Sequence, residues 1–312
     1  MLSNFLHNLY AKIVVFLGAV FVVVFLVIFT GNNAPDITVT EENNINRLNI
    51  FDSISLEAKA AYVWDVNKQE ALYTLNEEAQ LPLASLTKLM TAIAAIDILP
   101  ESFVVTVDED ALAQEGDSGL YANERWNAKE LIRFMLVVSS NDGASAVANV
   151  AGLLKSSFPA RDGESRKAFV KEMNLKAREV GLNQTYFINP TGLDTNEVIG
   201  GAYGSAKDIT RLLEYAVVNN PEIIDATRHS KLSFSSLNNI EHTATNTNSY
   251  IDKLPGLIAS KTGFTDLAGG NLVVAFDAGM NHPIVISVLG STQQGRFEDI
   301  EKLVNASLKS LE

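Results

Sequence analysis

Ser85 and Lys88 are the two residues of this 312-residue chain whose types and spacing best suit covalent chemistry. They lie three positions apart, so on a helix their side chains share one face. Pro82 stands just upstream, and the apolar run 89–96 contains no Gly or Pro, which predicts a buried helix starting near Ser85. The helix dipole and partial burial of the lysine would then favour a serine nucleophile activated by a neutral lysine base. The same spacing also fits a capping serine followed by a surface lysine.

A second polar cluster, Ser139-Ser140-Asn141-Asp142, falls between predicted helices at 128–138 and 142–154. Ser139 and Asn141 would lie on the connecting turn, with their side chains free to enter a cleft. A hydroxyl can relay a proton, and a side-chain amide can both donate to and accept from a substrate amide. Both residues are also common helix caps, and this cluster alone favours that simpler role.

A third cluster, Ser260-Lys261-Thr262-Gly263-Phe264-Thr265, lies within a predicted strand at 257–264. A glycine inside a strand often marks the close approach of a ligand or of another backbone. Lys261 and Thr262 beside it could bind a carboxylate by charge and by hydroxyl. The alternative is an edge strand that a lysine keeps soluble.

The elements that must position these clusters follow from hydrophobic periodicity and turn residues. The sequence predicts strands at 60–66, 70–75, 257–264, 270–277 and 282–289, and helices at 128–138, 142–154, 164–180, 205–218 and 296–311. A hairpin turn is expected at 67–69 and a loop at 189–193. Strands therefore lie at both ends of the domain, with a mostly helical insertion between them.

The composition excludes several classes of function. The formal charge is −13 and the sequence pI is near 4.8, with no basic patch along the chain, so nucleic acid is not an expected partner. The chain has no cysteine, which excludes thiol catalysis and disulfides. Its four histidines are not paired at metal-ligand spacing, so we expect no metal site: His7, His229, His242 and His282.

The N-terminal region predicts a membrane anchor. Residues 13–30 are almost entirely apolar, which is short but sufficient for one membrane-spanning helix. A cleaved signal peptide is the alternative, although 30–34 matches a cleavage site poorly. Lys12 precedes the span and acidic residues follow it, which places residues 1–12 in the cytoplasm and the main domain outside. We assign 31–52 as a linker and 53–312 as the catalytic domain.

Together the three clusters form the ordered motif set S-x-x-K, S-x-N and K-T-G of penicillin-binding proteins and class A β-lactamases. The chain resembles the serine D-alanyl-D-alanine carboxypeptidases, the low-molecular-weight penicillin-binding proteins of peptidase family S11, over roughly residues 55–312. Further matching segments are 63–65, 84–92, 189–193 and 261–265 with 268–269. This resemblance implies a β-lactamase/transpeptidase-like α/β (α+β) fold. Its antiparallel sheet would be flanked by helices and joined to a mostly helical subdomain.

The resemblance also implies a role for each matched residue. Ser85 would be the nucleophile, Lys88 its base and Ser139 a proton-relay hydroxyl. Asn141 would orient the substrate amide, while the K-T-G strand and an arginine late in the chain would bind the terminal carboxylate. The implied substrate-binding residues are Asn141, Lys261, Thr262, Gly263, Phe264 and Arg296. Backbone N–H groups of Ser85 and Phe264 would form the oxyanion hole.

The implied function is a serine-type D-Ala-D-Ala carboxypeptidase without cofactor, acting on peptidoglycan stem peptides and inhibited covalently by β-lactams. Together with the apolar N-terminal segment, this function predicts a single-pass protein of a bacterial cell membrane with an extracytoplasmic catalytic domain. A D,D-endopeptidase, a class A-like β-lactamase and a non-enzymatic wall-binding or β-lactam-sensing domain are the alternatives. A β-lactamase needs a deacylating glutamate, and the matching region has none before Glu197. The approach to K-T-G at 252–260 is longer than the family pattern, and Arg296 would be a surface charge if it had no role in the site.

Overall fold

The computed structural model describes residues 50–156 and 163–311, and its centre is a five-stranded antiparallel sheet with the order β10-β11-β12-β1-β2. The strands are β1 (Ala60–Asp65), β2 (Glu70–Leu75), β10 (Leu257–Thr265), β11 (Gly269–Asp277) and β12 (Pro283–Ser291). β1 pairs with β12 from Ala60↔Leu289 to Asp65↔Ile284, so the two ends of the domain close one sheet. The prediction of an antiparallel sheet built from both ends is confirmed.

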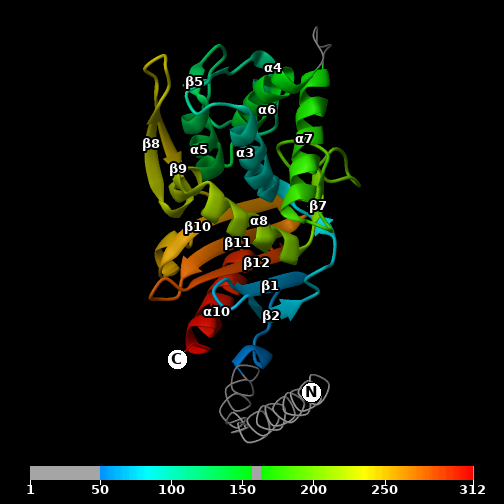
Figure 1. The fold of residues 1–312 in the computed structure, drawn as a ribbon, viewed down its shortest axis with the longest axis vertical. Coiled ribbons are helices and arrows are strands. Elements are labelled where there is room, and N and C mark those ends of the chain that lie inside the picture. The colour runs from blue at the N-terminus through cyan, green and yellow to red at the C-terminus, as the bar shows by residue number, and fades with distance from the viewer. Residues whose placement is uncertain (1–49, 157–162, 312) are drawn as a thin grey trace, which may run out of the picture. The chain divides into compact units, whose positions relative to one another are not determined.

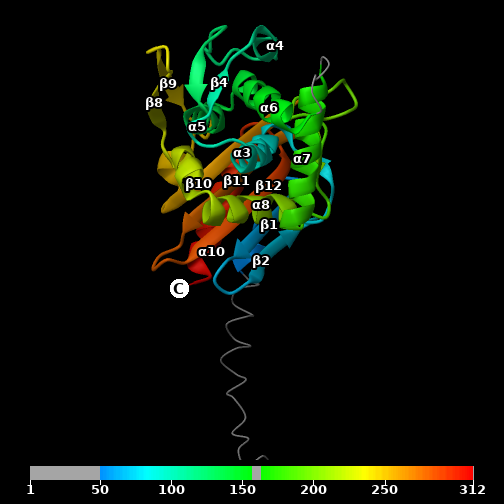
Figure 2. The ribbon, with the colours of Figure 1, turned by 45° about the horizontal axis from the view of Figure 1, so that its top comes forward.

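Helices cover both faces of the sheet (Figures 1 and 2). On one face, α10 (Gly295–Lys309) packs its apolar stripe against β11 and β12, enclosing a core around Phe276 and Ile300. On the other face, α8 (Ala206–Asn219) lies across β12, β1 and β11. Ser205 caps α8, as predicted, because its side chain accepts from the backbone N–H of Asp208.

A helical subdomain extends from the α8 face of the sheet and encloses the larger core. Its helices are α3 (Thr87–Ile98), α4 (Glu109–Leu112), α5 (Ala128–Val138), α6 (Asn141–Lys155), α7 (Glu164–Val180) and α9 (Pro221–Ile224). α3 is apolar on nearly every side and is buried along most of its length, which confirms the predicted buried helix. The Ser85 and Ser139 clusters lie at the ends of helices of this subdomain, and the Lys261 cluster lies on β10 of the main sheet.

Three small sheets were not predicted from the sequence. They comprise β4 (Val104–Thr106) with β5 (Arg125–Asn127), β3 (Leu81–Pro82) with β7 (Ala202–Gly204) and β6 (Tyr186–Phe187), and the hairpin β8 (Lys231–Ser235) with β9 (Glu241–Thr245). Strands of two to five residues carry too little alternation to be distinguished from loops. In the main sheet, β12 begins at Pro283 rather than at residue 282.

The beginning of the domain lies at Ile50, where the compact unit starts. Phe51 is buried and stacks on Tyr73 with ring centroids 5.6 Å apart. Within residues 50–156 and 163–311, no helix is long and apolar enough to cross a membrane. The predicted anchor at 13–30 and most of the linker lie outside the described residues.

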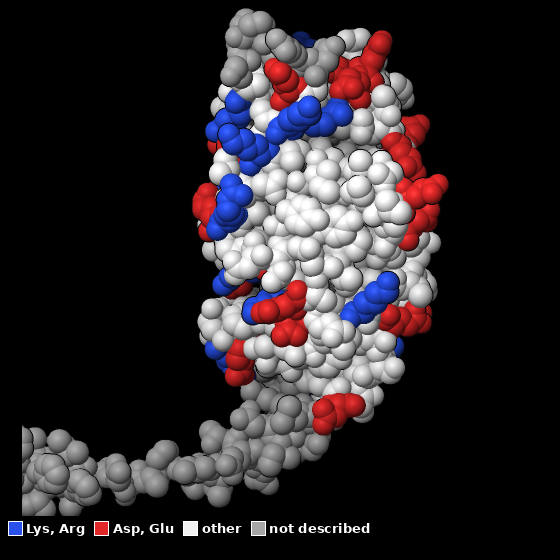
Figure 3. Space-filling view, turned by 90° about the vertical axis from the view of Figure 1, so that its right-hand side faces the viewer, with Lys and Arg blue, Asp and Glu red and all other residues white. Residues whose placement is uncertain are grey.

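The side of the domain that carries α7 has a broad central area without charged side chains, bordered by separate groups of cations and carboxylates (Figure 3). Exposed apolar residues occur on the segment that joins α7 to β7: Tyr186, Ile188, Val198 and Ile199. The surface charge of the domain is therefore distributed unevenly.

Candidate active site

Ser85 lies in a single 3₁₀ turn, η1 (Ala84–Leu86), that leads directly into α3. The predicted helix start at Ser85 is thus one turn of tighter helix, closed by Leu86 N donating to Leu83 O at 3.3 Å. Ala84 adopts a left-handed φ of +49°, an uncommon conformation for a residue with a side chain. The serine is consequently presented at a constrained bend between β3 and α3.

Lys88 is completely buried, one helical turn beyond the serine. Its Nζ donates to Ser85 Oγ at 2.9 Å, to Asn141 Oδ1 at 2.6 Å and to the carbonyl of Thr191 at 2.7 Å. Burial lowers the pKa of Lys88 from 10.5 to about 7, and the negative charge of Asp142 partly opposes this effect. The amine is therefore available as a base near neutral pH, and the alternative of a surface lysine is wrong.

The consecutive residues Ser139, Ser140 and Asn141 of the second cluster have different contacts. Ser140 is the helix cap, because its Oγ accepts from Gly143 N at 2.8 Å at the start of α6. Ser139 ends α5 in a left-handed conformation with φ of +60°. Its hydroxyl accepts from Lys261 Nζ at 2.9 Å. Ser139 caps α5 only through its backbone, so the side chains of Ser139 and Asn141 are free to reach the lysines of the site.

Lys261 lies on β10, which is an edge strand, but its side chain points into the protein. The residue is 2% exposed, so the alternative of a lysine that solubilises the edge is wrong. Its Nζ donates to Ser139 Oγ and to the carbonyl of Thr262 at 2.8 Å. Burial, followed by the positive charges of Lys88 and Arg296, holds the pKa of Lys261 well below its ordinary value.

Gly263 allows β10 to pass directly against the serine turn. A Cβ at this position would lie 2.9 Å from Leu83 O and 3.2 Å from Ser85 N. Real side chains essentially do not tolerate such contacts with backbone, so the sequence-based expectation of a close backbone approach is confirmed. Phe264, the next residue, is 43% exposed at the mouth of the site.

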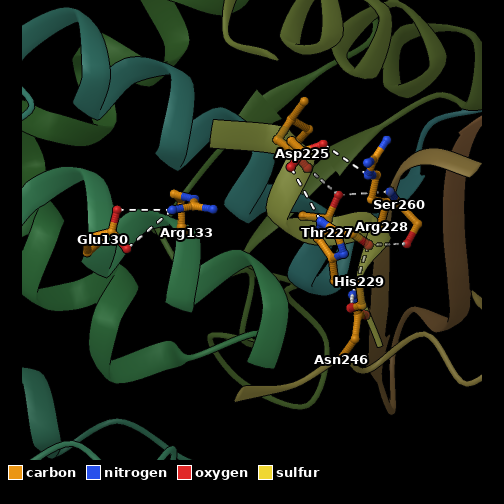
Figure 4. A network of polar contacts seen from close by, with 9 residues as sticks. Glu130, Arg133, Asp225, Thr227, Arg228, His229, Asn246 and Ser260 are labelled. Carbon is orange, nitrogen blue, oxygen red and sulfur yellow. Dashed lines mark hydrogen bonds and ion pairs between the residues drawn. The ribbon is translucent and has the colours of Figure 1, made fainter. Parts of the chain in front are cut away.

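A polar network centred on Thr227 holds β10 in place just before Lys261 (Figure 4). Thr227 Oγ1 accepts from Ser260 N at 3.1 Å, and its carbonyl accepts from Ser260 Oγ at 3.2 Å. Asn246 Nδ2 donates to the same carbonyl at 2.9 Å and to that of His229 at 3.1 Å. These contacts fix the strand immediately before Lys261.

Thr247 is a site residue that the sequence did not reveal. Its Oγ1 lies 2.6 Å from Thr262 Oγ1, so two hydroxyls meet beside the K-T-G strand. The residue follows β9 in a loop whose Asn246 Oδ1 accepts from Asn248 N at 2.9 Å. An Asn-Thr-Asn sequence predicts only a turn, and the pairing depends on how the segment after β9 packs against β10.

Arg296 begins α10 and reaches the same strand. It is only 7% exposed, so the alternative of a surface charge is wrong. Its Nη1 donates to the carbonyl of Gly263 at 2.6 Å, and its guanidinium lies over the Phe297 ring at 4.7 Å. Burial lowers the pKa of Arg296 from 12.5 to about 10, and the side chain remains a cation at neutral pH.

The loop at 189–193 closes the site on the side of α3. Asn189 Oδ1 accepts from Gly192 N at 2.7 Å and from Thr191 N at 3.2 Å. Thr91 Oγ1 on α3 donates to the carbonyl of Pro190 at 2.6 Å. The loop therefore presents the Thr191 carbonyl to Lys88 as a fixed acceptor.

We expect Gly192→Ala to destabilise the domain strongly. Gly192 has a φ of +81°, and a Cβ there would lie 1.9 Å from Ala84 O, beside the serine turn. The left-handed conformation costs about 1–2 kcal/mol and the clash adds to it, for a total of at least about 3 kcal/mol. Gly119→Ala is the matched control, because Gly119 has a φ of +80° with nothing within 4 Å of its added Cβ. Equal shifts of the unfolding midpoint in urea for both variants would contradict the role assigned to the close packing.

The assembled site is a hydroxyl beside a buried amine, with further cations and hydroxyls along one strand. Such a set can activate a serine, relay a proton and bind an anion. Within the described part of the chain, no cluster of His, Cys, Asp or Glu is arranged to hold a metal ion. All nine predicted site residues lie on the segments that meet here: Ser85, Lys88, Ser139, Asn141, Lys261, Thr262, Gly263, Phe264 and Arg296.

Comparison with known proteins gives concordant matches. The peptidase S11 family model, described as D-alanyl-D-alanine carboxypeptidase, matches residues 47–293. A D-alanyl-D-alanine endopeptidase of Escherichia coli is 30% identical over 78% of this chain and 75% of its own length. D-alanyl-D-alanine carboxypeptidase DacF of Bacillus subtilis is 28% identical to this chain. The match covers 82% of this chain and 63% of the length of DacF.

Solved structures share the fold. The ampicillin-bound form of penicillin-binding protein D2 from Listeria monocytogenes is 26% identical, with a TM-score of 0.66, over 83% of this chain and 99% of that one. A mutant form of Streptomyces K15 DD-transpeptidase is 22% identical, with a TM-score of 0.73, over 82% of this chain and 100% of that one. The second likeness concerns the fold alone.

Proposed function

This chain belongs to the peptidase S11 family, and from that premise we propose that it is a serine-type D-Ala-D-Ala carboxypeptidase that acts on peptidoglycan stem peptides. The observation that carries the proposal is the buried Lys88 amine, 2.9 Å from Ser85 Oγ, with a pKa lowered to about 7 by burial. A lysine in this state can take the proton of a serine hydroxyl at physiological pH.

In the proposed acylation step, the neutral Lys88 amine removes the Ser85 proton while Oγ attacks the carbonyl of the penultimate D-Ala. The backbone N–H groups of Ser85 and Phe264 stabilise the oxyanion, and each such donor is typically worth about 3 kcal/mol. Ser139 gives its proton to the leaving amine and takes one from Lys261, and the terminal D-Ala departs. The donation from Lys261 Nζ to Ser139 Oγ at 2.9 Å supports this relay role. A water molecule then cleaves the acyl-enzyme ester and regenerates the serine.

Substrate binding is assigned to the remaining site residues. Asn141 orients the substrate amide, and Lys261 and Thr262 bind the terminal carboxylate together with Arg296. Gly263 lets the strand approach the serine, and Phe264 forms the outer wall. Arg296, which remains a cation at neutral pH, supports an anionic ligand, although the chain as a whole carries −13. β-Lactams present a reactive carbonyl and a carboxylate, so we propose that they acylate Ser85.

A D,D-endopeptidase is the second candidate function. One observation favours it: two relatives named D-alanyl-D-alanine endopeptidase, from Escherichia coli and Pseudomonas aeruginosa, are each 30% identical to this chain. Both activities use the same acylation chemistry at the carbonyl of a D-Ala residue. They differ in whether the leaving amine belongs to free D-Ala or to a cross-linked peptide.

We also propose that residues 13–30 anchor the protein in a bacterial cell membrane with its catalytic domain outside. The apolar composition of that segment and the acidic residues after it support this location. Membrane fractionation of the full-length chain tests the proposal. Recovery of a mature protein that begins after residue 30 would contradict it.

The activity is tested with two peptides. A carboxypeptidase should release free D-Ala from a stem pentapeptide ending in D-Ala-D-Ala, whereas an endopeptidase should cleave a cross-linked dimer into two peptides. Release only from the dimer would favour the endopeptidase. No turnover of either peptide by a protein that penicillin still acylates would favour a β-lactam-sensing domain.

We expect Arg296→Ala to lower kcat/KM by roughly 10- to 150-fold on a peptide with a free C-terminal carboxylate, as for one charge-assisted hydrogen bond. The loss should be much smaller on the C-terminally amidated peptide, where no anion is present. Some loss will be common to both substrates because Arg296 also donates to Gly263 O at 2.6 Å. Arg296→Lys is the control that keeps the charge but loses the forked geometry. Equal losses on both peptides would show that Arg296 only supports β10.

A further inference from the structure

Asp142 lies beside the site, yet none of the proposed roles uses it. Its side chain is buried, and its Oδ2 accepts from Ser118 Oγ at 2.8 Å and from Ser118 N at 3.4 Å. Its Oδ1 has no hydrogen-bond partner among the residues that the structure describes. A buried carboxylate with an unpaired oxygen is costly, so its presence requires an explanation.

The partner of Asp142 connects a loop to the catalytic cluster. Ser118 Oγ also lies 2.6 Å from Ser140 Oγ, the cap of α6. Ser118 therefore joins the loop between α4 and β5 to the first turn of α6. A break in this contact would release the loop on the side that faces Asn141.

The same loop orients the Asn141 amide. The carbonyl of Glu115 accepts from Asn141 Nδ2 at 2.6 Å, and Asn141 Oδ1 accepts from Lys88 Nζ at 2.6 Å. A side-chain amide turned by half a revolution would present a donor to the amine instead of an acceptor. The position of the Glu115 carbonyl thus decides which end of the amide meets Lys88.

Asp142 also acts on Lys88 through its charge. Its carboxylate favours the protonated amine and opposes the effect of burial on the pKa of Lys88. Two other charged groups interact electrostatically in this region. Lys261 on β10 interacts with Lys88, and Arg296 on α10 interacts with Lys261. Asp117, in the loop, acts on Asp142. Asp142 is therefore the carboxylate that favours the protonated form of Lys88.

We infer that Asp142 is a positioning residue for acylation: through Ser118 it fixes the loop that orients Asn141, and its carboxylate offsets the positive charge around Lys88. This inference rests on the proposed function. Asp142 itself touches neither the nucleophile nor the position of the substrate.

The experiment measures the rate of acylation by a labelled penicillin against pH for the full-length chain and three variants. In Asp142→Asn the plateau rate should fall by roughly 10- to 100-fold. The acid limb, the part of the pH–rate profile in which the rate rises with pH, should move to lower pH. Without the carboxylate of Asp142, the Lys88 amine loses its proton more easily. In Ser118→Ala the plateau rate should also fall, but the acid limb should stay in place because the carboxylate remains. Asp117→Asn is the charge-matched control in the same loop and should stay within about two-fold of wild type.

Several outcomes would overturn the inference. One is a folded Asp142→Asn variant with the wild-type plateau and acid limb, and another is an equal shift of the acid limb in Asp117→Asn. A third is an Asp142→Asn variant whose acylation rate falls only as much as its thermal stability does, with an unchanged acid limb. That result would show that Asp142 has a purely structural role. If Asp142→Asn does not fold, full activity of Ser118→Ala would overturn it instead. A wild-type protein that is not labelled would overturn the proposed function, and this inference with it.

Discussion

Ser85→Ala is expected to abolish covalent labelling by penicillin and to lower peptide hydrolysis by more than about 10⁴-fold, since no other hydroxyl replaces a lost nucleophile. The fold should survive, because the change removes one contact, the bond from Lys88 Nζ at 2.9 Å, and Ser85 is only partly buried. A single hydrogen bond of this kind contributes about 1 kcal/mol to stability.

Mass spectrometry of the labelled peptide provides the measurement, and circular dichroism verifies the fold. Ser230→Ala is the control, because Ser230 is exposed and this variant should label like wild type. Labelling of a peptide that lacks residue 85, or retained labelling in Ser85→Ala, would contradict the assignment of the nucleophile.

Lys88 is expected to give the second large effect, visible in the pH dependence of acylation. Because burial lowers the pKa of Lys88 to about 7, the neutral base accumulates as the pH rises through about 7. The acylation rate should therefore rise through the same range and level off above it. Lys88→Met should reduce the plateau by roughly 10²- to 10⁴-fold, the usual contribution of a general base, and should remove the acid limb.

Lys207→Met is the matched control, because Lys207 is 48% exposed and pairs with Glu78 at the surface. It should keep both the plateau and the acid limb. An acid limb that persists in Lys88→Met would show that another group titrates and would transfer the role of base elsewhere.

The lowered pKa of Lys88 also makes the stability of the folded domain depend on pH. The folded form holds the Lys88 proton less tightly than the unfolded chain, in which the pKa has its ordinary value of 10.5. The unfolded state therefore binds more protons between about pH 7 and 10.5, and the contribution of Lys88 to stability rises with pH over that range. Below this range the group works against folding by a constant amount.

Local patterns in the sequence were sufficient to predict part of the site. The spacing of Ser85 and Lys88 indicated a shared helical face, and Gly263 indicated a close backbone approach. The first prediction depends only on the spacing of two residues along the chain, and the second depends only on the absence of a side chain. Both properties can be taken directly from the sequence. The five strands of the main sheet were predicted for the same reason, since each is long enough to alternate or to form a continuous apolar run.

Features that depend on tertiary packing could not be predicted in this way. Ser139, Ser140 and Asn141 are all plausible N-caps by type, and only the structure shows that Ser140 is the one of the three whose side chain caps α6. Lys261 lies on an edge strand, where a lysine usually faces solvent, but its side chain is buried and meets the end of α5 at Ser139. Thr247 joins the site only because the segment after β9 packs against β10.

The pairing of β1 with β12 has a consequence for the order of events during synthesis. β1 can pair early with β2, which follows it directly, but its other partner, β12, is synthesised far later, since Ala60 pairs with Leu289. α10 follows β12 and supplies the Arg296 contact to Gly263 O. A nascent chain in which β12 and α10 have not yet been synthesised lacks both, and contacts this distant in sequence form late and slowly. The serine turn should therefore become reactive only after β12 and α10 have folded against the rest of the domain.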